Sequence, residues 1–192
     1  FERCNIPCLY FGDFFERTEV QDLLALLSLV AEPHGPALMH VAQFPQYGVS
    51  HDDLAAVFAW RRAQKVPALD ALRRLDEIEG VSADGRARLA RLLADVSFVD
   101  WPMHAHRFLS QYLFGRTEPL RRLLADRTVG GQQRLLAIYQ LLQFAFAFKP
   151  PKGGDPKRAF LDHIRRLEVL DEEKQLRQLP AAARDINAVR LM

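Results

Sequence analysis

Apolar side chains recur every three or four residues through most of the chain, and proline or glycine interrupts them at intervals. The first such segment follows Thr18, places Val20, Leu23 and Leu27 on one face, and stops before Pro33. This spacing is typical of a helix with one buried face. We expect further helices at about 37–44, 51–64, 67–80, 82–96, 102–114, 118–125, 132–148 and 155–168. The body of the chain is therefore predicted to be mainly α.

Residues that favour helix starts precede several of these segments. Thr18 with Gln21, and Ser50 with Asp53, match the capping-box pattern, in which a hydroxyl accepts the N–H three residues later. Ser82 precedes another segment, and Pro67 suits the first turn of a helix. These residues predict where the helices begin.

Both ends of the chain differ from this helical body. The segments Ile6–Gly12 and Ala188–Met192 are short and β-prone, and they lie at opposite termini. Two strands flanking a helical body are typical of an insertion into a domain that contains a sheet, and such strands can pair. The chain also begins with Phe1 and has no signal sequence, so we interpret it as an excised piece of a longer protein.

The composition permits one hydrophobic core and excludes a disordered chain, because 49% of the 192 residues are hydrophobic. With 26 basic and 24 acidic residues the net charge is only +2, so any basic surface must be local. No apolar run approaches the length of a membrane span. Cys4 and Cys8 have no second pair to complete a zinc site, and we expect reduced thiols and a cytoplasmic protein.

No motif for catalysis stands out. The chain has no phosphate-binding loop of the Gly-x-x-x-x-Gly-Lys-Ser/Thr type, and its serines lack the Gly-x-Ser-x-Gly turn of a hydrolase. His104 and His106 are expected to point to different faces of a helix, without a metal. Phe144, Phe146 and Phe148 are interpreted as a buried helix end rather than a base-stacking platform. We predict no catalytic and no metal-binding residue.

The loop from Phe44 to Ser50 is a candidate site. It joins two predicted helices, and the amides of Gly48, Val49 and Ser50 would lie at the start of the second helix. Such amides bind phosphate without reading base sequence. A plain helix cap explains the same residues equally well.

The residues from Ile6 to Leu23 read IPCLYFGDFFERTEVQDL. This run resembles a stretch of UvrD/Rep/PcrA-like superfamily 1A DNA helicases that reads Ile-Pro-Tyr-x-x-Tyr-Gly-Gly-x-x-Phe-Phe-Glu-Arg-x-Glu-Ile-Lys-Asp. In that family the stretch closes the first half of the RecA-like domain 2A. The loop Pro45–Ser50 falls where the family has Pro-x-Arg-Gly-Ile-Gly, a duplex-gripping element of domain 2B. The final residues, Ala188–Met192, resemble the strand that leads into motif V.

The resemblance implies three parts: residues 1–31 as the end of the first 2A half, 32–184 as the helical 2B domain, and 185–192 as the returning 2A strand. It implies DNA contact through Tyr47, Gly48, Val49 and Ser50, with a serine in place of the second glycine and no arginine in the loop. It also implies a structural hinge at Phe15, Glu16, Arg17 and Glu19.

The function implied is that of an accessory, regulatory domain in an ATP-dependent DNA helicase of repair or recombination. ATP and magnesium would bind to other parts of the parent, and this piece alone is not expected to hydrolyse ATP. Expected partners are duplex or junction DNA, the other domains of the parent helicase, and repair or recombination proteins, at the bacterial nucleoid and not at a membrane. The alternative is a protein-docking or autoregulatory module with little DNA affinity of its own.

Overall fold

The computed structural model describes residues 8–10, 14–115, 118–170 and 189–191. The described chain is mainly helical, as the sequence predicts. Its elements are β1 (Cys8–Tyr10), η2 (Phe14–Glu16), α1 (Thr18–Ala31), α2 (Ala37–Val41), α3 (His51–Gln64), α4 (Ala68–Arg73), η3 (Leu75–Glu77), α5 (Ala83–Val96), α6 (Ala105–Gly115), α7 (Glu118–Ala125), α8 (Val129–Ala147), α9 (Pro156–Leu170) and β2 (Val189–Leu191).

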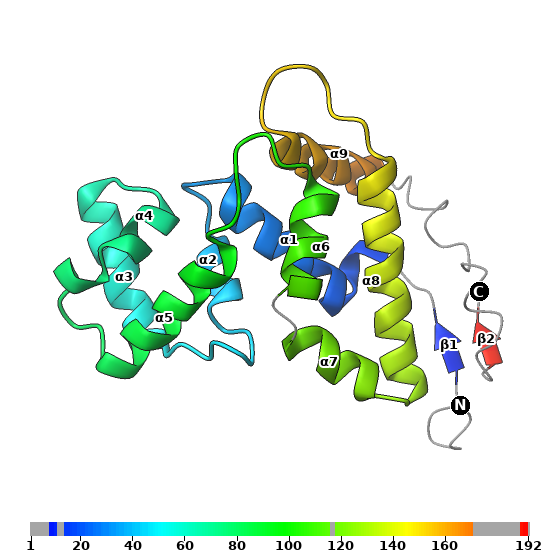
Figure 1. Ribbon diagram of the computed structural model, residues 1–192, viewed down its shortest axis with the longest axis horizontal. Helices are drawn as coiled ribbons and strands as arrows, with labels where there is room; N and C mark the ends of the chain where they lie inside the picture. The colour runs from blue at the N-terminus through cyan, green and yellow to red at the C-terminus, as the bar shows by residue number, and fades with distance from the viewer. Residues whose placement is uncertain (1–7, 11–13, 116–117, 171–188, 192) are drawn as a thin grey trace.

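Helix α1 lies in the middle of the body (Figure 1) and packs against α2, α6, α8 and α9. Its apolar residues surround most of its circumference, which suits a central helix. The fully buried side chains include Val20, Leu26 and Leu27, and they belong to the same hydrophobic cluster as Leu54 of α3 and Phe160 of α9. The hydrophobic core therefore contains residues from both sides of the predicted domain boundary at residue 31. The boundary itself stays a prediction.

Helices α3, α4 and α5 gather at one side of the molecule, and α8 and α9 lie at the other (Figure 1). The N-cap roles of Ser50 and Ser82 are confirmed, because their hydroxyls accept the N–H of Asp53 and of Gly85, respectively. The capping box at Thr18 is wrong. Helix α1 begins at Thr18 itself, and Arg17 takes the N-cap position without a side-chain hydrogen bond.

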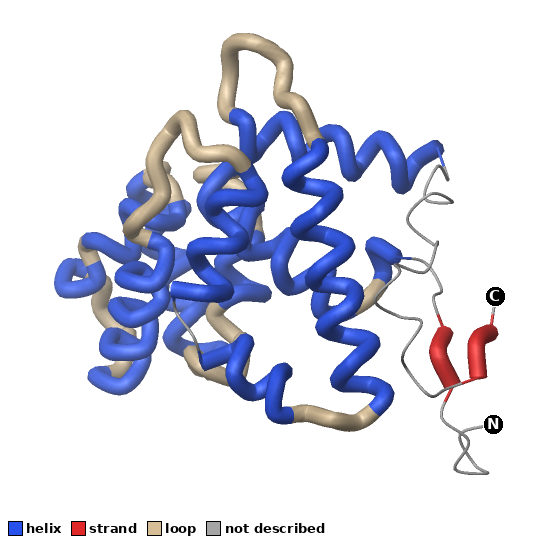
Figure 2. Tube along the Cα trace, turned by 45° about the vertical axis from the view of Figure 1, so that its right-hand side comes forward, coloured by secondary structure: helices blue, strands red, loops and turns tan. Residues whose placement is uncertain are grey.

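The two strands pair in parallel, with Cys8 opposite Val189 and Tyr10 opposite Leu191. Figure 2 shows this pair beside the helical body. The expected pairing of the end segments is thus present, and the whole helical body forms the connection between two neighbouring strands.

Other helix bounds differ from the predicted ones. The expected helix 67–80 is shorter in the structure. Helix α4 follows Pro67 and ends at Arg73, and the short 3-10 helix η3 replaces its last turns before Gly80. Helix α8 begins at Val129, so the predicted glycine break lies inside its first turn. There Thr128 accepts the N–H of Gly131, and this cap outweighs the low helix propensity of glycine.

Candidate nucleic-acid interface

The loop from Phe44 to Ser50 turns sharply before α3. Gly48 has φ 55°, a left-handed conformation that glycine adopts at little cost. The N–H of Gly48 donates to the carbonyl of Phe44 at 2.8 Å, and the N–H of Val49 donates to the carbonyl of Ala42 at 2.9 Å. These two amides are therefore engaged within the chain, which weakens their predicted role as phosphate donors.

Tyr47 lies inside the fold and connects this loop to α5 and α6. Its side chain is fully buried, and its hydroxyl lies 3.0 Å from Asp95 Oδ2 of α5 and 3.0 Å from the hydroxyl of Tyr112 of α6. Gln46 donates to the same Tyr112 hydroxyl at 3.1 Å. Burial raises the pKa of both tyrosines, so both stay protonated at neutral pH. The loop is rigidly tied to α5 and α6.

Ser50 and Asp53 form the centre of a second network. The Ser50 hydroxyl donates to Asp53 Oδ2 at 2.7 Å and accepts the N–H of Asp53 at 3.1 Å. The other carboxylate oxygen accepts the N–H of Ser82 at 2.6 Å, and the Ser82 hydroxyl also donates to Asp53. The hydrogen bond from Ser50, then those from Ser82, lower the pKa of Asp53. One buried carboxylate thus joins the N-termini of α3 and α5, where helix dipoles favour a negative charge.

The four predicted DNA-binding residues consequently divide into two pairs. Tyr47 and Val49 are buried and support the loop, whereas Gly48 and Ser50 are exposed on its outer surface. Only the exposed pair can touch a ligand directly.

Arg88 of α5 adds a cation to this surface. Its Nη1 donates to the carbonyls of Tyr47 at 2.8 Å and Gly48 at 3.3 Å, and its Nε donates to Asp84 at 2.6 Å. The side chain is 43% exposed. Sequence reasoning missed Arg88, because its spacing from Asp84 indicates only an ordinary ion pair along a helix. Arg91, one turn further along the same helix, is also exposed.

The predicted hinge residues lie where α1 begins. Phe15 is buried, with its ring 5.3 Å from that of Phe14 and 6.3 Å from that of Phe144 of α8. Arg17 Nε donates to Glu19 at 2.7 Å, and Glu16 is exposed. Phe15 therefore anchors the segment in the core, and the charged residues surround the first turn of α1.

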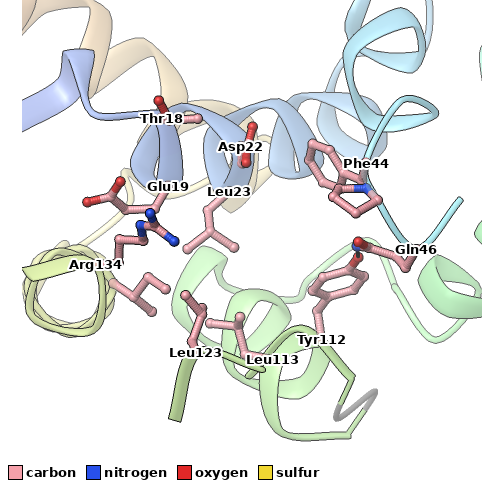
Figure 3. A pocket seen from close by; sticks show the side chains of 12 residues that line it. Thr18, Glu19, Asp22, Leu23, Phe44, Gln46, Tyr112, Leu113, Leu123 and Arg134 are labelled. Carbon is pink, nitrogen blue, oxygen red and sulfur yellow. Dashed lines mark hydrogen bonds between the residues drawn. The ribbon is translucent and has the colours of Figure 1, made fainter. Parts of the chain in front are cut away.

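Glu19 of the predicted hinge and Phe44, Pro45 and Gln46 of the loop line one hollow of about 440 Å³, bounded by α1, α6, α7 and α8. Figure 3 shows Glu19 and Asp22 of α1 along one side, Arg134 reaching from α8 towards Glu19, and Gln46 beside Tyr112. Apolar side chains line two sides of the hollow, with Leu23 of α1 facing Leu113 and Leu123.

No group of three or more metal-ligating side chains occurs within the described residues. His104 precedes α6 and His106 lies on it, so the two do not occupy different faces of one helix as predicted, and their ring centroids are 5.7 Å apart. Phe144 and Phe148 pack on the core as expected, whereas Phe146 is 69% exposed. Within the described part of the chain, no helix combines the length and apolar character of a membrane span.

No family model matches this chain. The ATP-dependent DNA helicase PcrA of Bacillus subtilis (strain 168) is 23% identical to it over 166 residues. The match covers 84% of this chain but 22% of that helicase, so the chain spans about a fifth of the relative's length. The chain is therefore similar to one part of a DNA helicase.

Proposed function

We propose that this chain is an accessory, 2B-like domain of an ATP-dependent DNA helicase and that it contacts duplex DNA ahead of the motor. The observation that carries the proposal is the similarity to PcrA across 84% of the chain. Regulation of unwinding in DNA repair or recombination, at the bacterial nucleoid, follows from that similarity and from the resemblance of Ile6–Leu23 and Ala188–Met192 to the two edges of a 2A domain.

The pairing of β1 with β2 supports an inserted domain. All-parallel sheets occur almost only in proteins whose helices cover both faces of the sheet. Here two short parallel strands lie at the side of a helical body, and that body forms the connection between them. A larger sheet, supplied by the rest of a parent protein, would give these strands their usual surroundings. Residues 1–31 and 185–192 would then belong to the parent's RecA-like domain.

The loop surface supports contact with a nucleic-acid backbone. Gly48 and Ser50 are exposed on it, and no side chain at Gly48 blocks close approach. Arg88 lies directly beside Gly48 and brings a guanidinium, paired through its Nε with Asp84, to a loop that has no basic residue of its own. A guanidinium next to exposed backbone is suited to phosphate and carries no base preference. Tyr47 and Val49 would act by holding the loop in this shape.

ATP hydrolysis is assigned to other parts of the parent. The sequence has no phosphate-binding loop of the kind that holds ATP with magnesium. The proposed hinge, through which motion of the motor reaches the helical body, consists of Phe15, Glu16, Arg17 and Glu19.

The alternative function, protein docking or autoregulation, is favoured by one observation: the amides of Gly48 and Val49 are already hydrogen-bonded within the chain.

Fluorescence anisotropy of a labelled hairpin duplex and of a single strand, at low and moderate salt, tests the proposal. The loop surface predicts binding that prefers the duplex and weakens steeply as salt rises, because phosphate contacts release counterions. Absence of duplex binding at low salt would favour the docking or autoregulatory alternative.

A further inference from the structure

Trp101 is presented to solvent far from the loop at Gly48. The residue lies between α5 and α6, and its side chain is 68% exposed. The other tryptophan, Trp60, is partly buried and has the guanidinium of Arg74 over its ring at 4.9 Å. Exposing an indole to water is unfavourable, and a partner that covers Trp101 would remove this cost.

The backbone around Trp101 is held in place by a buried lysine. Lys157 of α9 is 2% exposed, and its ammonium donates to the carbonyls of Asp100 and Trp101, each at 3.0 Å. It also lies 2.9 Å from Asp155 Oδ1, which balances its charge. Because the main chain is fixed in this way, the indole can bind a partner with little loss of backbone entropy.

A basic segment of the chain begins at the end of α8 and continues into α9. Between Lys149 and Arg166 the sequence has six basic and two acidic residues, whereas the chain as a whole has 26 and 24. Lys149, Lys152 and Arg158 are exposed, and Arg158 lines the same hollow as Trp101. In Figures 1 and 2 the α5–α6 and α8–α9 loops project from the same side of the body. The exposed cations Lys149, Lys152 and Arg158 therefore form one local group of positive charge on this side of the body.

We propose that Trp101, with Lys149, Lys152 and Arg158, forms a binding site for single-stranded nucleic acid. A base would stack on the exposed indole, and the three cations would contact the phosphates on either side. Sites that bind single strands without sequence preference combine exposed aromatic rings with a basic groove in this manner. The site is separate from the loop at Gly48 and goes beyond duplex contact.

The charges favour a polyanion over a protein partner. Of the acidic groups beside the indole, Asp155 is paired with Lys157, and Asp100 is the exposed one. The cations of the α8–α9 loop, Lys149 and Lys152, have no carboxylate within ion-pair distance among the described residues. A single strand suits both the exposed indole and these cations, because each nucleotide brings an aromatic base and a phosphate.

The fluorescence of Trp101 tests this site directly in a Trp60→Phe background, where it is the remaining tryptophan. Titration with an oligothymidylate of about 10 nucleotides should quench the indole, because a stacked base lies within contact distance. Trp101→Ala, followed by anisotropy of a labelled oligomer, should weaken binding at least about fivefold, and Trp101→Phe should retain part of the affinity.

Substitution of the cations tests the phosphate contacts. Lys152→Gln and Arg158→Gln should each lower the slope of log affinity against log salt by about 0.7. Arg62→Gln, an exposed residue on α3, serves as the matched control and should leave that slope unchanged. Gly48→Asp should leave the quenching intact, which separates this site from the loop.

Binding of the oligomer without quenching, or equal affinity of Trp101→Ala and the parent, would overturn the proposal. Absence of oligomer binding at low salt would also overturn it and would leave Trp101 as a protein contact. Duplex binding at the loop is measured independently, so the two proposals can fail separately.

Discussion

The backbone N–H of Ser82 donates a 2.6 Å hydrogen bond to the carboxylate of Asp53, so the start of α5 is fixed to the first turn of α3. Asp53 is 5% exposed and also accepts hydrogen bonds from the hydroxyls of Ser50 and Ser82. The loop at Gly48 directly precedes this junction. Its shape therefore depends on the Asp53 network.

Asp53→Asn is predicted to destabilise the domain by about 1–3 kcal/mol, because the amide nitrogen replaces an acceptor among buried donors. Urea unfolding followed by circular dichroism measures this change. Asp52→Asn is the matched control, since Asp52 is the exposed neighbour on the same helix turn. Equal unfolding free energies for Asp53→Asn and the parent would contradict the role assigned to the network.

The same network predicts a pH dependence. Hydrogen bonds from Ser50 and Ser82 hold the pKa of Asp53 below its ordinary value of 3.8. Asp53 therefore contributes stability that is fully present above about pH 4 and is lost as the pH falls through its lowered pKa. The stability difference between the parent and Asp53→Asn should narrow below about pH 4 and be constant from pH 5 to 7. Unfolding titrations across this range measure it.

Gly85→Ala should destabilise the domain more than an ordinary helix substitution. A Cβ at Gly85 would overlap the carboxylate of Asp53, which is held by its own hydrogen bonds and cannot move away cheaply. The matched control is Gly115→Ala at the end of α6, where the nearest atom would be 4.0 Å away. Thermal unfolding should show a clear loss for Gly85→Ala and a change within about 1 kcal/mol for Gly115→Ala. Similar melting temperatures for the two variants would be inconsistent with the close approach.

Lys157→Met is expected to cost about 3 kcal/mol, because it leaves Asp155 buried without its counter-ion and two carbonyls without their donor. Lys152→Met removes a charge of the same sign from an exposed position and should be close to neutral. Chemical denaturation distinguishes these results. A neutral Lys157→Met would mean that the lysine does not hold the α5–α6 loop.

Glu32 and Arg165 connect the end of α1 to α9. Their side chains form two hydrogen bonds, at 2.6 and 2.8 Å, although the residues lie 133 positions apart. Arg165 is 51% exposed, so a double-mutant cycle of Glu32→Gln and Arg165→Gln should give a coupling of only about 0.5–1 kcal/mol. The coupling should decrease in high salt. A salt-independent coupling of several kcal/mol would contradict this weak, solvent-screened pair.

Much of the fold follows from local patterns in the sequence. The apolar spacing after Thr18 and the hydroxyls of Ser50 and Ser82 predicted helices and caps that the structure contains. The capping box predicted Thr18 as the N-cap of the first helix. This prediction is wrong because the pattern of Thr18 and Gln21 does not determine where the helical backbone begins, and Arg17 is the N-cap. The interruption at Gly80 likewise could not reveal that the preceding turn is a 3-10 helix.

The candidate site was less predictable, because burial and long-range contacts decide it. Tyr47 lies between Gln46 and Gly48 in a predicted loop, so the sequence favoured an exposed residue there. In the structure its hydroxyl meets Asp95 and Tyr112, and these partners come from separate helices. Arg88 reaches Gly48 from 40 residues away, a contact that no local spacing signals. Their arrangement depends on how α5 packs beside the loop.

The duplex-binding role of the loop is tested most directly by comparing Gly48→Asp with Gly48→Asn. Both residues tolerate the φ of 55° better than most, and a Cβ at this position would lie 3.0 Å from Arg88 Nη1. The aspartate would pair with Arg88 and add a negative charge, whereas the asparagine has the same shape without that charge. In anisotropy titrations with a hairpin duplex at low salt, we predict that Gly48→Asp binds at least about tenfold more weakly than Gly48→Asn. Equal affinities of the two variants would contradict a DNA contact at this loop.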